Sequence, residues 1–131
     1  MLKASLDHIN MSVKDLNQSV EWYNKIFDFK KVEEGVSSDG PWAILKSENS
    51  MLCLYQEASS KLNQNEANLR IYHFGLKISD KDLWNKKIID YKVKILYGGE
   101  VRYPHSVSWY LIDPSGYEIE VSYWDQDEIC F

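Results

Sequence analysis

His8-Ile-Asn-Met-Ser-Val-Lys-Asp15 and, 65 residues later, His73-Phe-Gly-Leu-Lys-Ile-Ser-Asp80 are the two stretches that decide the fold. Each begins with a histidine, places apolar residues two positions apart, and ends on an aspartate that precedes a segment with helical periodicity. Alternation with a period of two is typical of a strand with one buried face. Each stretch therefore predicts a strand followed by a helix.

A second pair of segments repeats at nearly the same spacing. Residues 42–54 align with residues 109–121 at an offset of 67, so that Trp42 matches Trp109. In both segments a strand-like run leads through a polar turn to a second strand-like run. A long period that occurs only twice favours an internal duplication over a solenoid. Chance similarity between short alternating strands is the alternative.

The repeated order predicted for each half is a strand, a helix and three more strands. Asp15 is expected to cap the first helix, and Ser79 with Asp82 is expected to form a capping box on the second. The expected ranges are strands at 5–13, 29–36, 41–46, 51–56, 70–79, 92–97, 106–112 and 117–124, a first helix that begins after Asp15, and a second helix at about 80–91. The expected buried stripes are Leu16, Val20, Tyr23 and Phe27 on the first helix, and Leu83, Trp84, Ile88 and Tyr91 on the second.

Length and composition bound the class of protein. A chain of 131 residues suits one domain, and we expect residues 1–131 to form it, with module one at about 1–57, a linker at about 58–69 and module two at about 70–131. The net charge of −5 without a basic run gives no footprint for nucleic acid or an anionic membrane. Without a signal peptide, a membrane span or a disulfide framework, we expect a cytoplasmic protein.

Strand parity places three potential metal ligands on polar strand faces. The apolar residues of each strand should pack under a helix, which leaves His8, His73 and Glu120 on the opposite faces. If the two sheets curve around a shared cleft, these three side chains meet. Two imidazoles and a carboxylate suit Fe, Mn, Ni, Co or Zn, and leave positions open for substrate. Each residue alone would be an ordinary strand residue, and the symmetric histidines favour the metal site.

Four segments resemble the vicinal oxygen chelate superfamily: residues 6–9 (LDHI), 16–29, 72–76 (YHFGL) and 113–120 (DPSGYEIE). The superfamily contains glyoxalase I, extradiol dioxygenases, fosfomycin-resistance thiol transferases, methylmalonyl-CoA epimerase and bleomycin-resistance proteins. The resemblance covers nearly the whole chain. It implies an α+β fold of two βαβββ modules that form a cupped, mixed, eight-stranded sheet with the helices outside, usually in a homodimer.

The resemblance also implies a chemistry. His8, His73 and Glu120 match the ligands of one divalent metal ion per site, whose charge stabilises two adjacent oxygens of a chelated small-molecule substrate. The leading interpretation is therefore a metal-dependent enzyme: a ring-cleavage dioxygenase, an isomerase or lyase, or a thiol transferase. The alternative is a non-catalytic drug- or metabolite-binding module like the bleomycin-resistance members. Those members lack the metal ligands, so the intact set counts against that alternative.

Details of the resemblance do not single out one activity. Glyoxalase I typically has a fourth ligand, a glutamate, where this chain has Cys53, which is either a thiolate ligand or part of the cleft wall. The fosfomycin enzymes resemble residues 51–54 and 108–110, but the lysine that they carry upstream corresponds to Glu100, which would weaken phosphonate binding. Extradiol dioxygenases share a tyrosine ten residues before the metal glutamate, here Tyr110, and use it to orient or protonate the substrate, so the resemblance implies a catalytic role for Tyr110. These dioxygenases also carry a histidine further upstream. This chain has Val101 at the corresponding position, so that histidine is not matched.

Further candidates lie near the predicted site. His105, in the loop segment GGEVRYPHS (98–106), is a candidate acid or base near neutral pH, with a surface histidine as the alternative. Arg102 is a candidate for a bidentate contact to a substrate carboxylate, with a surface ion pair as the alternative. Ser108 shares a strand face with Tyr110, and Asn10 shares one with His8. The predicted substrate contacts are Asn10, Cys53, Arg102 and Ser108.

Overall fold

The computed structural model describes residues 1–57 and 70–129. The chain divides into two compact units, Met1–Ala67 and Asn68–Phe131, and each is described by itself. The predicted linker at about 58–69 lies outside the described residues. That both modules form a single domain stays a prediction.

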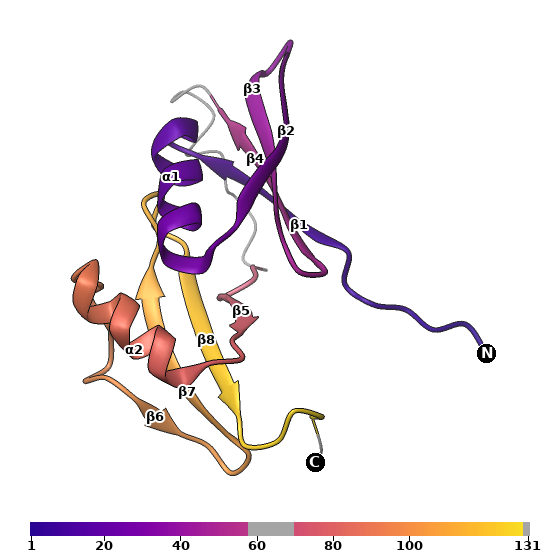
Figure 1. The fold of residues 1–131 in the computed structure, drawn as a ribbon. Helices are drawn as coiled ribbons and strands as arrows, with labels where there is room; N and C mark the ends of the chain where they lie inside the picture. Colours follow the sequence, from indigo (N-terminus) through magenta and orange to yellow (C-terminus); the bar gives the residue numbers. More distant parts are fainter. Residues whose placement is uncertain (58–69, 130–131) are drawn as a thin grey trace. The chain divides into compact units, whose positions relative to one another are not determined.

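Both units show the same order of elements (Figure 1). The first contains β1 (His8–Val13), α1 (Leu16–Phe27), β2 (Lys30–Ser37), β3 (Gly40–Ser47) and β4 (Ser50–Gln56). The second contains β5 (Phe74–Lys77), α2 (Lys81–Asp90), β6 (Val101–Arg102), β7 (Ser106–Ile112) and β8 (Glu118–Trp124).

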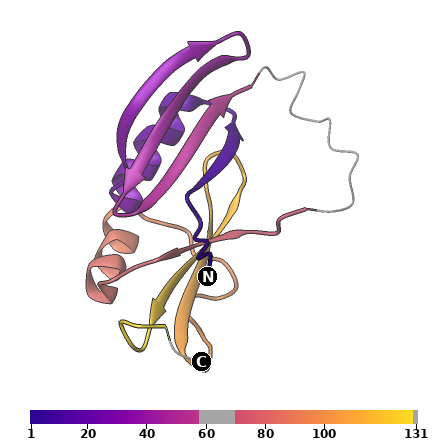
Figure 2. The ribbon, with the colours of Figure 1, turned by 90° about the vertical axis from the view of Figure 1, so that its right-hand side faces the viewer.

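Each unit is a four-stranded mixed sheet with one helix (Figure 2). The strand orders are β1-β4-β3-β2 and β5-β8-β7-β6, in which the first neighbours are parallel and the others antiparallel. The predicted α+β fold of two βαβββ modules is confirmed, and the eight strands that the described residues form are divided equally between two sheets. Among the helices that the structure describes, none is both long enough and apolar enough to cross a membrane.

The parallel strand pairs have the same register in both units. Asn10 lies opposite Cys53 in the first unit, and Gly75 lies opposite Glu120 in the second. His8 and His73 each lie two residues before this pair, so the two histidines are equivalent positions. Cys53 is therefore the positional counterpart of Glu120, which agrees with the internal duplication.

The antiparallel strands correct one detail of the predicted repeat. Trp42 pairs with Tyr55, and the equivalent pair in the second unit is Ser108 with Ser122. Matching Trp42 with Trp109 is therefore wrong by one residue. Trp109 follows Ser108 directly on β7, so its side chain lies on the other face of the sheet. There it is buried, and its ring centroid is 6.3 Å from that of Trp84 in α2.

The loops before β4 and β8 explain this shift. The first turn contains two residues, since Ser47 pairs with Ser50. In the second, Asp113 N donates to Tyr117 O at 2.9 Å, so that pairing continues past Ile112 and leaves three residues, 114–116, in the loop. One extra loop residue shifts β7 by one position relative to the predicted alignment with β3. A shift of one residue moves every side chain of the strand to the other sheet face.

The helices begin at aspartates, as helix capping predicts. Asp15 accepts from the backbone N of Gln18 at 3.0 Å, and Asp80 accepts from Leu83 N at 2.9 Å. The expected capping box of Ser79 and Asp82 is wrong by one residue, because Asp80 is the N-cap of α2.

The buried stripes of the helices differ from the predicted ones in part. On α1 the buried residues are Leu16, Ser19, Tyr23 and Ile26, which keeps Leu16 and Tyr23 and replaces Val20 and Phe27. On α2 only Trp84 is buried. The predicted burial of Leu83 and Tyr91 is wrong, since both are about half exposed, at 48% and 49%.

Two predicted strands of the second unit are corrected. The strand expected at 70–79 is limited to Phe74–Lys77. Residues 92–97 form no strand, and the edge strand is instead the two-residue β6. The backbone turns at Tyr97, which has a left-handed φ of 57°, and Leu96 N donates to Tyr110 O at 2.7 Å. A left-handed residue followed by two glycines interrupts the extended backbone that a strand requires.

Candidate functional site

The second unit brings two of the predicted metal ligands together. His73 Nε2 lies 3.0 Å from Glu120 Oε2, and the other carboxylate oxygen accepts a hydrogen bond of 2.7 Å from Ser108 Oγ. Ser108 is fully buried on β7 and its hydroxyl also lies 3.2 Å from that of Ser122. The buried serine therefore orients the Glu120 carboxylate toward His73. Its predicted contact with a substrate stays a prediction.

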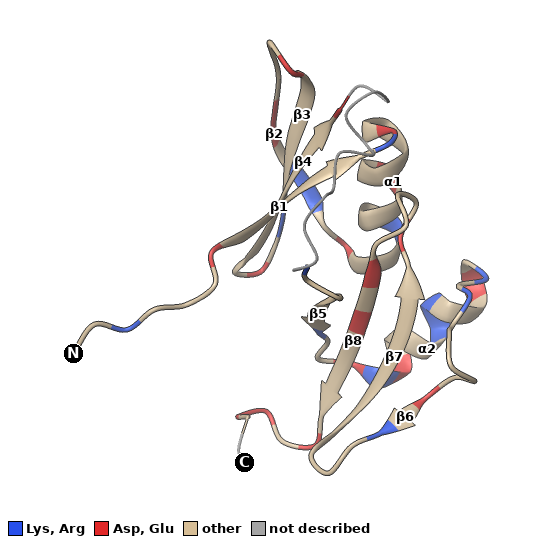
Figure 3. Cartoon of the chain, turned by 180° about the vertical axis from the view of Figure 1, so that it is seen from behind, with Lys and Arg blue, Asp and Glu red and all other residues tan. Residues whose placement is uncertain are grey.

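A second carboxylate flanks the same histidine. Glu118 lies two residues before Glu120 on β8, so that both face the same side of the sheet, and acidic positions mark this strand (Figure 3). Glu118 Oε2 is 3.7 Å from His73 Nδ1, while Oε1 accepts a hydrogen bond from the Tyr97 hydroxyl. This hydrogen bond is the first cause that raises the pKa of Tyr97 above its ordinary value.

Tyr110 occupies the position opposite Glu120 on the neighbouring strand. Its ring is edge-on to His73 with centroids 5.8 Å apart, and its hydroxyl lies 2.7 Å from that of Tyr103. Burial, followed by the hydrogen bond to Tyr103 and the charge of Glu120, raises the pKa of Tyr110 well above its ordinary value. At neutral pH Tyr110 is therefore a phenol that donates a hydrogen bond, and not a phenolate.

A hollow of about 490 Å³ opens beside these groups. The loop 103–106 lines one side of it, and Glu120, Ser122 and Trp124 of β8 line another. His105 lies in this loop and is exposed, and its carbonyl accepts from Asp125 N at 3.0 Å. The hollow therefore presents aromatic rings, hydroxyls and one carboxylate to a ligand.

Arg102 lies at the edge of this region in an ion pair. Its Nη1 and Nη2 donate to the two carboxylate oxygens of Asp125, with 2.7 Å for the first pair of atoms. This hydrogen bond is the main cause that holds the pKa of Asp125 below its ordinary value. The structure therefore shows the surface ion pair for Arg102, and a contact to a substrate carboxylate stays a prediction.

The first unit holds the third predicted ligand. His8, on β1, has its Nδ1 at 2.7 Å from Asp7 Oδ2. Cys53 is half-buried, and burial followed by the charge of Asp7 raises the pKa of its thiol. The raised pKa favours the protonated thiol in the metal-free protein, and both roles predicted for Cys53, thiolate ligand and cleft wall, stay predictions.

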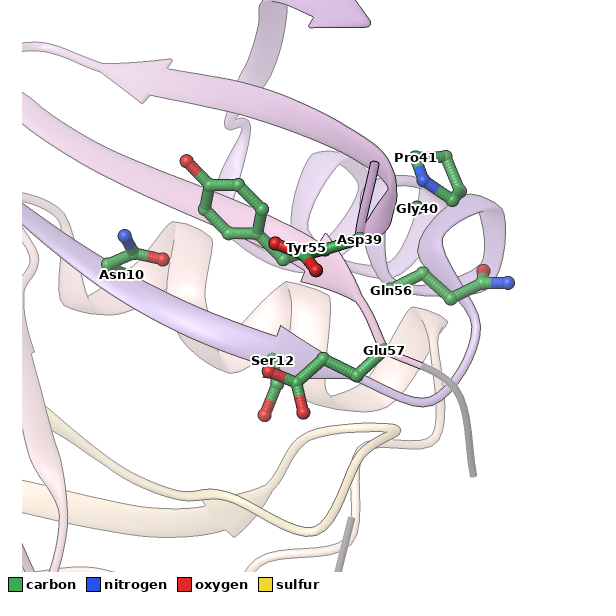
Figure 4. Close-up of a pocket in the computed structure, with 8 residues that line it drawn as sticks. All are labelled: Asn10, Ser12, Asp39, Gly40, Pro41, Tyr55, Gln56 and Glu57. Atoms are coloured by element: carbon green, nitrogen blue, oxygen red, sulfur yellow. The ribbon is translucent and has the colours of Figure 1, made fainter. Parts of the chain in front are cut away.

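Asn10 lines a separate pocket of about 270 Å³ in the first unit (Figure 4). Ser12 from the same strand, Tyr55 from β4 and the hairpin 39–41 line it as well. Asn10 therefore lines a pocket of the first unit, and its contact with a substrate stays a prediction.

The donor set of the predicted ligands fits a divalent metal ion. A histidine nitrogen and a carboxylate oxygen at 3.0 Å share the space where a cation would replace the hydrogen-bonded proton. Within the described parts of the chain, no three histidine, cysteine, aspartate or glutamate side chains form a metal-binding cluster. Since His8 belongs to one unit and His73 with Glu120 to the other, the three-ligand site stays a prediction.

Three residues of this region were not predicted from the sequence: Tyr97, Tyr103 and Glu118. Glu118 could have been found, because it shares strand parity with Glu120. Tyr97 and Tyr103 lie in loops, where no periodicity indicates which way a side chain points.

Known relatives agree with this architecture. The chain is 28% identical over 123 residues to metallothiol transferase FosB of Bacillus licheniformis, which covers 88% of this chain and 73% of that protein. It is 29% identical over 120 residues to the FosB of Staphylococcus epidermidis, which covers 90% and 80%. In fold it is similar to a glyoxylase/bleomycin resistance protein/dioxygenase domain from Frankia sp. EAN1pec, with a TM-score of 0.80 at 14% identity and coverage of 97% and 96%.

The family model described as the Glyoxalase/Bleomycin resistance protein/Dioxygenase superfamily matches residues 5–121. This range contains β1 to β7, both helices and the first residues of β8, among them His8, His73 and Glu120. Sequence and fold therefore agree that this chain belongs to the Glyoxalase/Bleomycin resistance protein/Dioxygenase superfamily.

Proposed function

We propose that this protein is a metal-dependent enzyme that transfers a thiol to a small substrate chelated through two vicinal oxygens. The observation that carries the proposal is the contact of 3.0 Å between His73 Nε2 and Glu120 Oε2, with Ser108 holding the second carboxylate oxygen. The similarity to proteins named metallothiol transferase FosB favours thiol transfer over ring cleavage and isomerisation.

The residues divide the work of such a reaction. His8, His73 and Glu120 would hold the ion, which supplies positive charge to the substrate oxygens when bound. The thiol sulfur forms a bond to an electrophilic carbon as a carbon–oxygen bond breaks, and the released oxygen takes up a proton. Tyr110, protonated at neutral pH, donates a hydrogen bond to this developing oxyanion. His105, at the rim of the hollow, is the candidate base for the thiol proton.

The position of Glu100 restricts the substrate. Where the fosfomycin-resistance enzymes are expected to have a lysine, this chain has a carboxylate, and it accepts from Lys81 Nζ at 3.2 Å. A carboxylate in place of a cation disfavours a doubly charged phosphonate. We therefore expect a less anionic substrate with vicinal oxygens, and we expect the active form to be a homodimer.

Elemental analysis tests the proposal first. The protein is purified without oxygen and without a polyhistidine tag, beside a His8→Ala variant. The proposal expects about one divalent ion per chain, lost in the variant, and loss of free thiol when the protein is given a low-molecular-weight thiol and a panel of epoxides. Bound iron with turnover of catechols but not of epoxides would point to ring cleavage instead.

A protein that binds no metal, even after reconstitution, would contradict the proposal. The favoured function would then be a non-catalytic binding module. The hollow lined by Tyr103, Tyr110 and Trp124 has the aromatic surface that such a module would offer to a ligand.

A further inference from the structure

Each of the two predicted ligand histidines, His8 and His73, has an acidic side chain near its Nδ1 atom. The internal duplication does not account for this pairing. In each unit a carboxylate faces the Nδ1 atom of the histidine. Asp7 Oδ2 lies 2.7 Å from His8 Nδ1, and Glu118 Oε2 lies 3.7 Å from His73 Nδ1. Nε2 of His73 faces Glu120 at 3.0 Å.

The carboxylates come from different positions in the two units. Asp7 is the direct neighbour of His8, and the equivalent position before His73 is Tyr72. The position equivalent to Glu118, by the register that matches Cys53 with Glu120, is Met51. The duplication therefore does not explain the acidic partner. Each unit places an acidic side chain near Nδ1 from a different sequence position. This indicates that the histidine needs a carboxylate near Nδ1.

Tyr97 directs the partner of His73. Its hydroxyl donates to Oε1 of Glu118, so that Oε2 is the oxygen turned toward the histidine. The left-handed φ of 57° at Tyr97 is uncommon for a residue with a side chain and has an energetic cost. The ring also packs against Tyr110, with centroids 5.3 Å apart.

We propose that Asp7 and Glu118 are positioning residues whose carboxylates face Nδ1 of His8 and His73 and so leave Nε2 of each ring as the metal-binding nitrogen. This inference rests on the proposed function. When Nε2 gives its lone pair to an ion, the proton of the neutral imidazole is on Nδ1, and a carboxylate that faces Nδ1 stabilises this tautomer. Such outer partners also fix the ring orientation and raise the basicity of the ligand, and losing one typically costs about 10- to 100-fold in metal affinity.

Metal affinity of the intact protein tests the inference, with Zn²⁺ and Mn²⁺ as probes in a competition titration against a chromophoric chelator. Asp7→Ala and Glu118→Ala are expected to weaken binding by about 10- to 100-fold. Asp7→Asn and Glu118→Gln keep an acceptor oxygen and are expected to lose less. Asp90→Asn is the matched control, since it removes one exposed carboxylate at the end of α2 in the second unit, and it should bind as the wild type does.

The outcomes separate the inference from the proposed function. Equal losses for the alanine, amide and control variants would show a general charge effect and overturn the inference, as would unchanged affinity in Asp7→Ala and Glu118→Ala. If the wild type itself binds neither ion, the proposed function fails, and the inference fails with it. The side chain of Asp7 is 74% exposed, so Asp7→Ala should fold normally even if Glu118→Ala does not.

Discussion

Ser108 shows how one buried hydroxyl connects the core to the candidate site. It is fully buried and donates to Glu120 Oε1 at 2.7 Å. A part-buried acceptor that loses its hydrogen-bond donor destabilises the folded state, because its desolvation is no longer compensated. Ser108 therefore affects both the stability of the fold and the placement of the Glu120 carboxylate.

Ser108→Ala is therefore expected to lower the free energy of unfolding by about 1 to 2 kcal/mol, because the carboxylate oxygen loses its donor while little volume is removed. Urea denaturation of the metal-free protein measures this. Ser122→Ala is the control, since the Ser122 hydroxyl lies 3.2 Å from that of Ser108, and the loss in free energy of unfolding should be smaller. Equal losses in the two variants would contradict the role of the Glu120 contact.

Arg102 and Asp125 give a prediction on pH. The hydrogen bonds from Arg102 lower the pKa of Asp125 from 3.8. A carboxyl whose pKa is lower in the folded state stabilises the fold above its unfolded pKa, and this contribution disappears as the pH falls through the folded pKa. The contribution to stability is small, since both groups lie at the surface.

Arg102→Ala is expected to raise the pKa of Asp125 toward its ordinary value, and Arg102→Lys is expected to raise it less, because lysine keeps the charge without the two-pronged geometry. Titration of the side-chain carboxyl by NMR measures both. A pKa of Asp125 that does not change in Arg102→Ala would show that the ion pair does not form in solution.

At the scale of elements, two aspartates begin the two helices in the same way. Asp15→Ala and Asp80→Ala are each expected to lower the free energy of unfolding by about 1 kcal/mol, because a backbone N–H of the first turn loses its acceptor. Asp15→Asn and Asp80→Asn are the controls, since asparagine caps about as well. Chemical denaturation followed by helical circular dichroism measures the losses, and equal losses for alanine and asparagine would argue against capping.

Two hairpin glycines, Gly40 and Gly116, allow backbone strain to be compared with steric overlap of an added Cβ atom. Gly40 and Gly116 both have left-handed φ values, of 127° and 101°. A Cβ at Gly40 would lie 2.6 Å from the carbonyl oxygen of Gln56, whereas nothing lies within 4 Å of one at Gly116. Gly116→Ala therefore introduces backbone strain alone, and Gly40→Ala adds a collision with the main chain of β4.

Gly40→Ala is expected to lower the free energy of unfolding by more than about 1 kcal/mol, and by clearly more than Gly116→Ala does. Thermal and urea denaturation of the two variants in parallel measure the difference. If Gly116→Ala is the more destabilising variant, the close approach of the β2–β3 hairpin to β4 is not present in solution.

At the scale of the whole molecule, the metal site would require both units. His8→Ala in the first unit and His73→Ala in the second are expected to lower metal affinity alike, although the contact between His73 and Glu120 lies within the second unit. A bound ion at about 100 times its Kd should stabilise the wild type by about 2.7 kcal/mol, so a thermal shift on metal addition measures the effect. A full shift in His8→Ala would exclude His8 from the site.

Much of the fold could be predicted from the sequence, and for a local reason. The βαβββ order, the Asp15 cap and the strand parity of His8 and Glu120 follow from periodicity and capping within short segments. The strand at 92–97 could not be excluded in the same way. Its apolar residues are compatible with a strand, and the left-handed backbone at Lys92 and Tyr97 interrupts it.

The duplication and the superfamily could be recognised from the sequence alone, and so could the sheet face of Glu120, because strand parity depends only on a period of two. Only the tertiary structure decided that Ser108, and not Trp109, is the counterpart of Trp42, since one extra loop residue changes the register. It alone brought Tyr97 and Glu118 to His73. Contacts of this kind depend on where loops place side chains that are distant along the chain, and no local pattern records that.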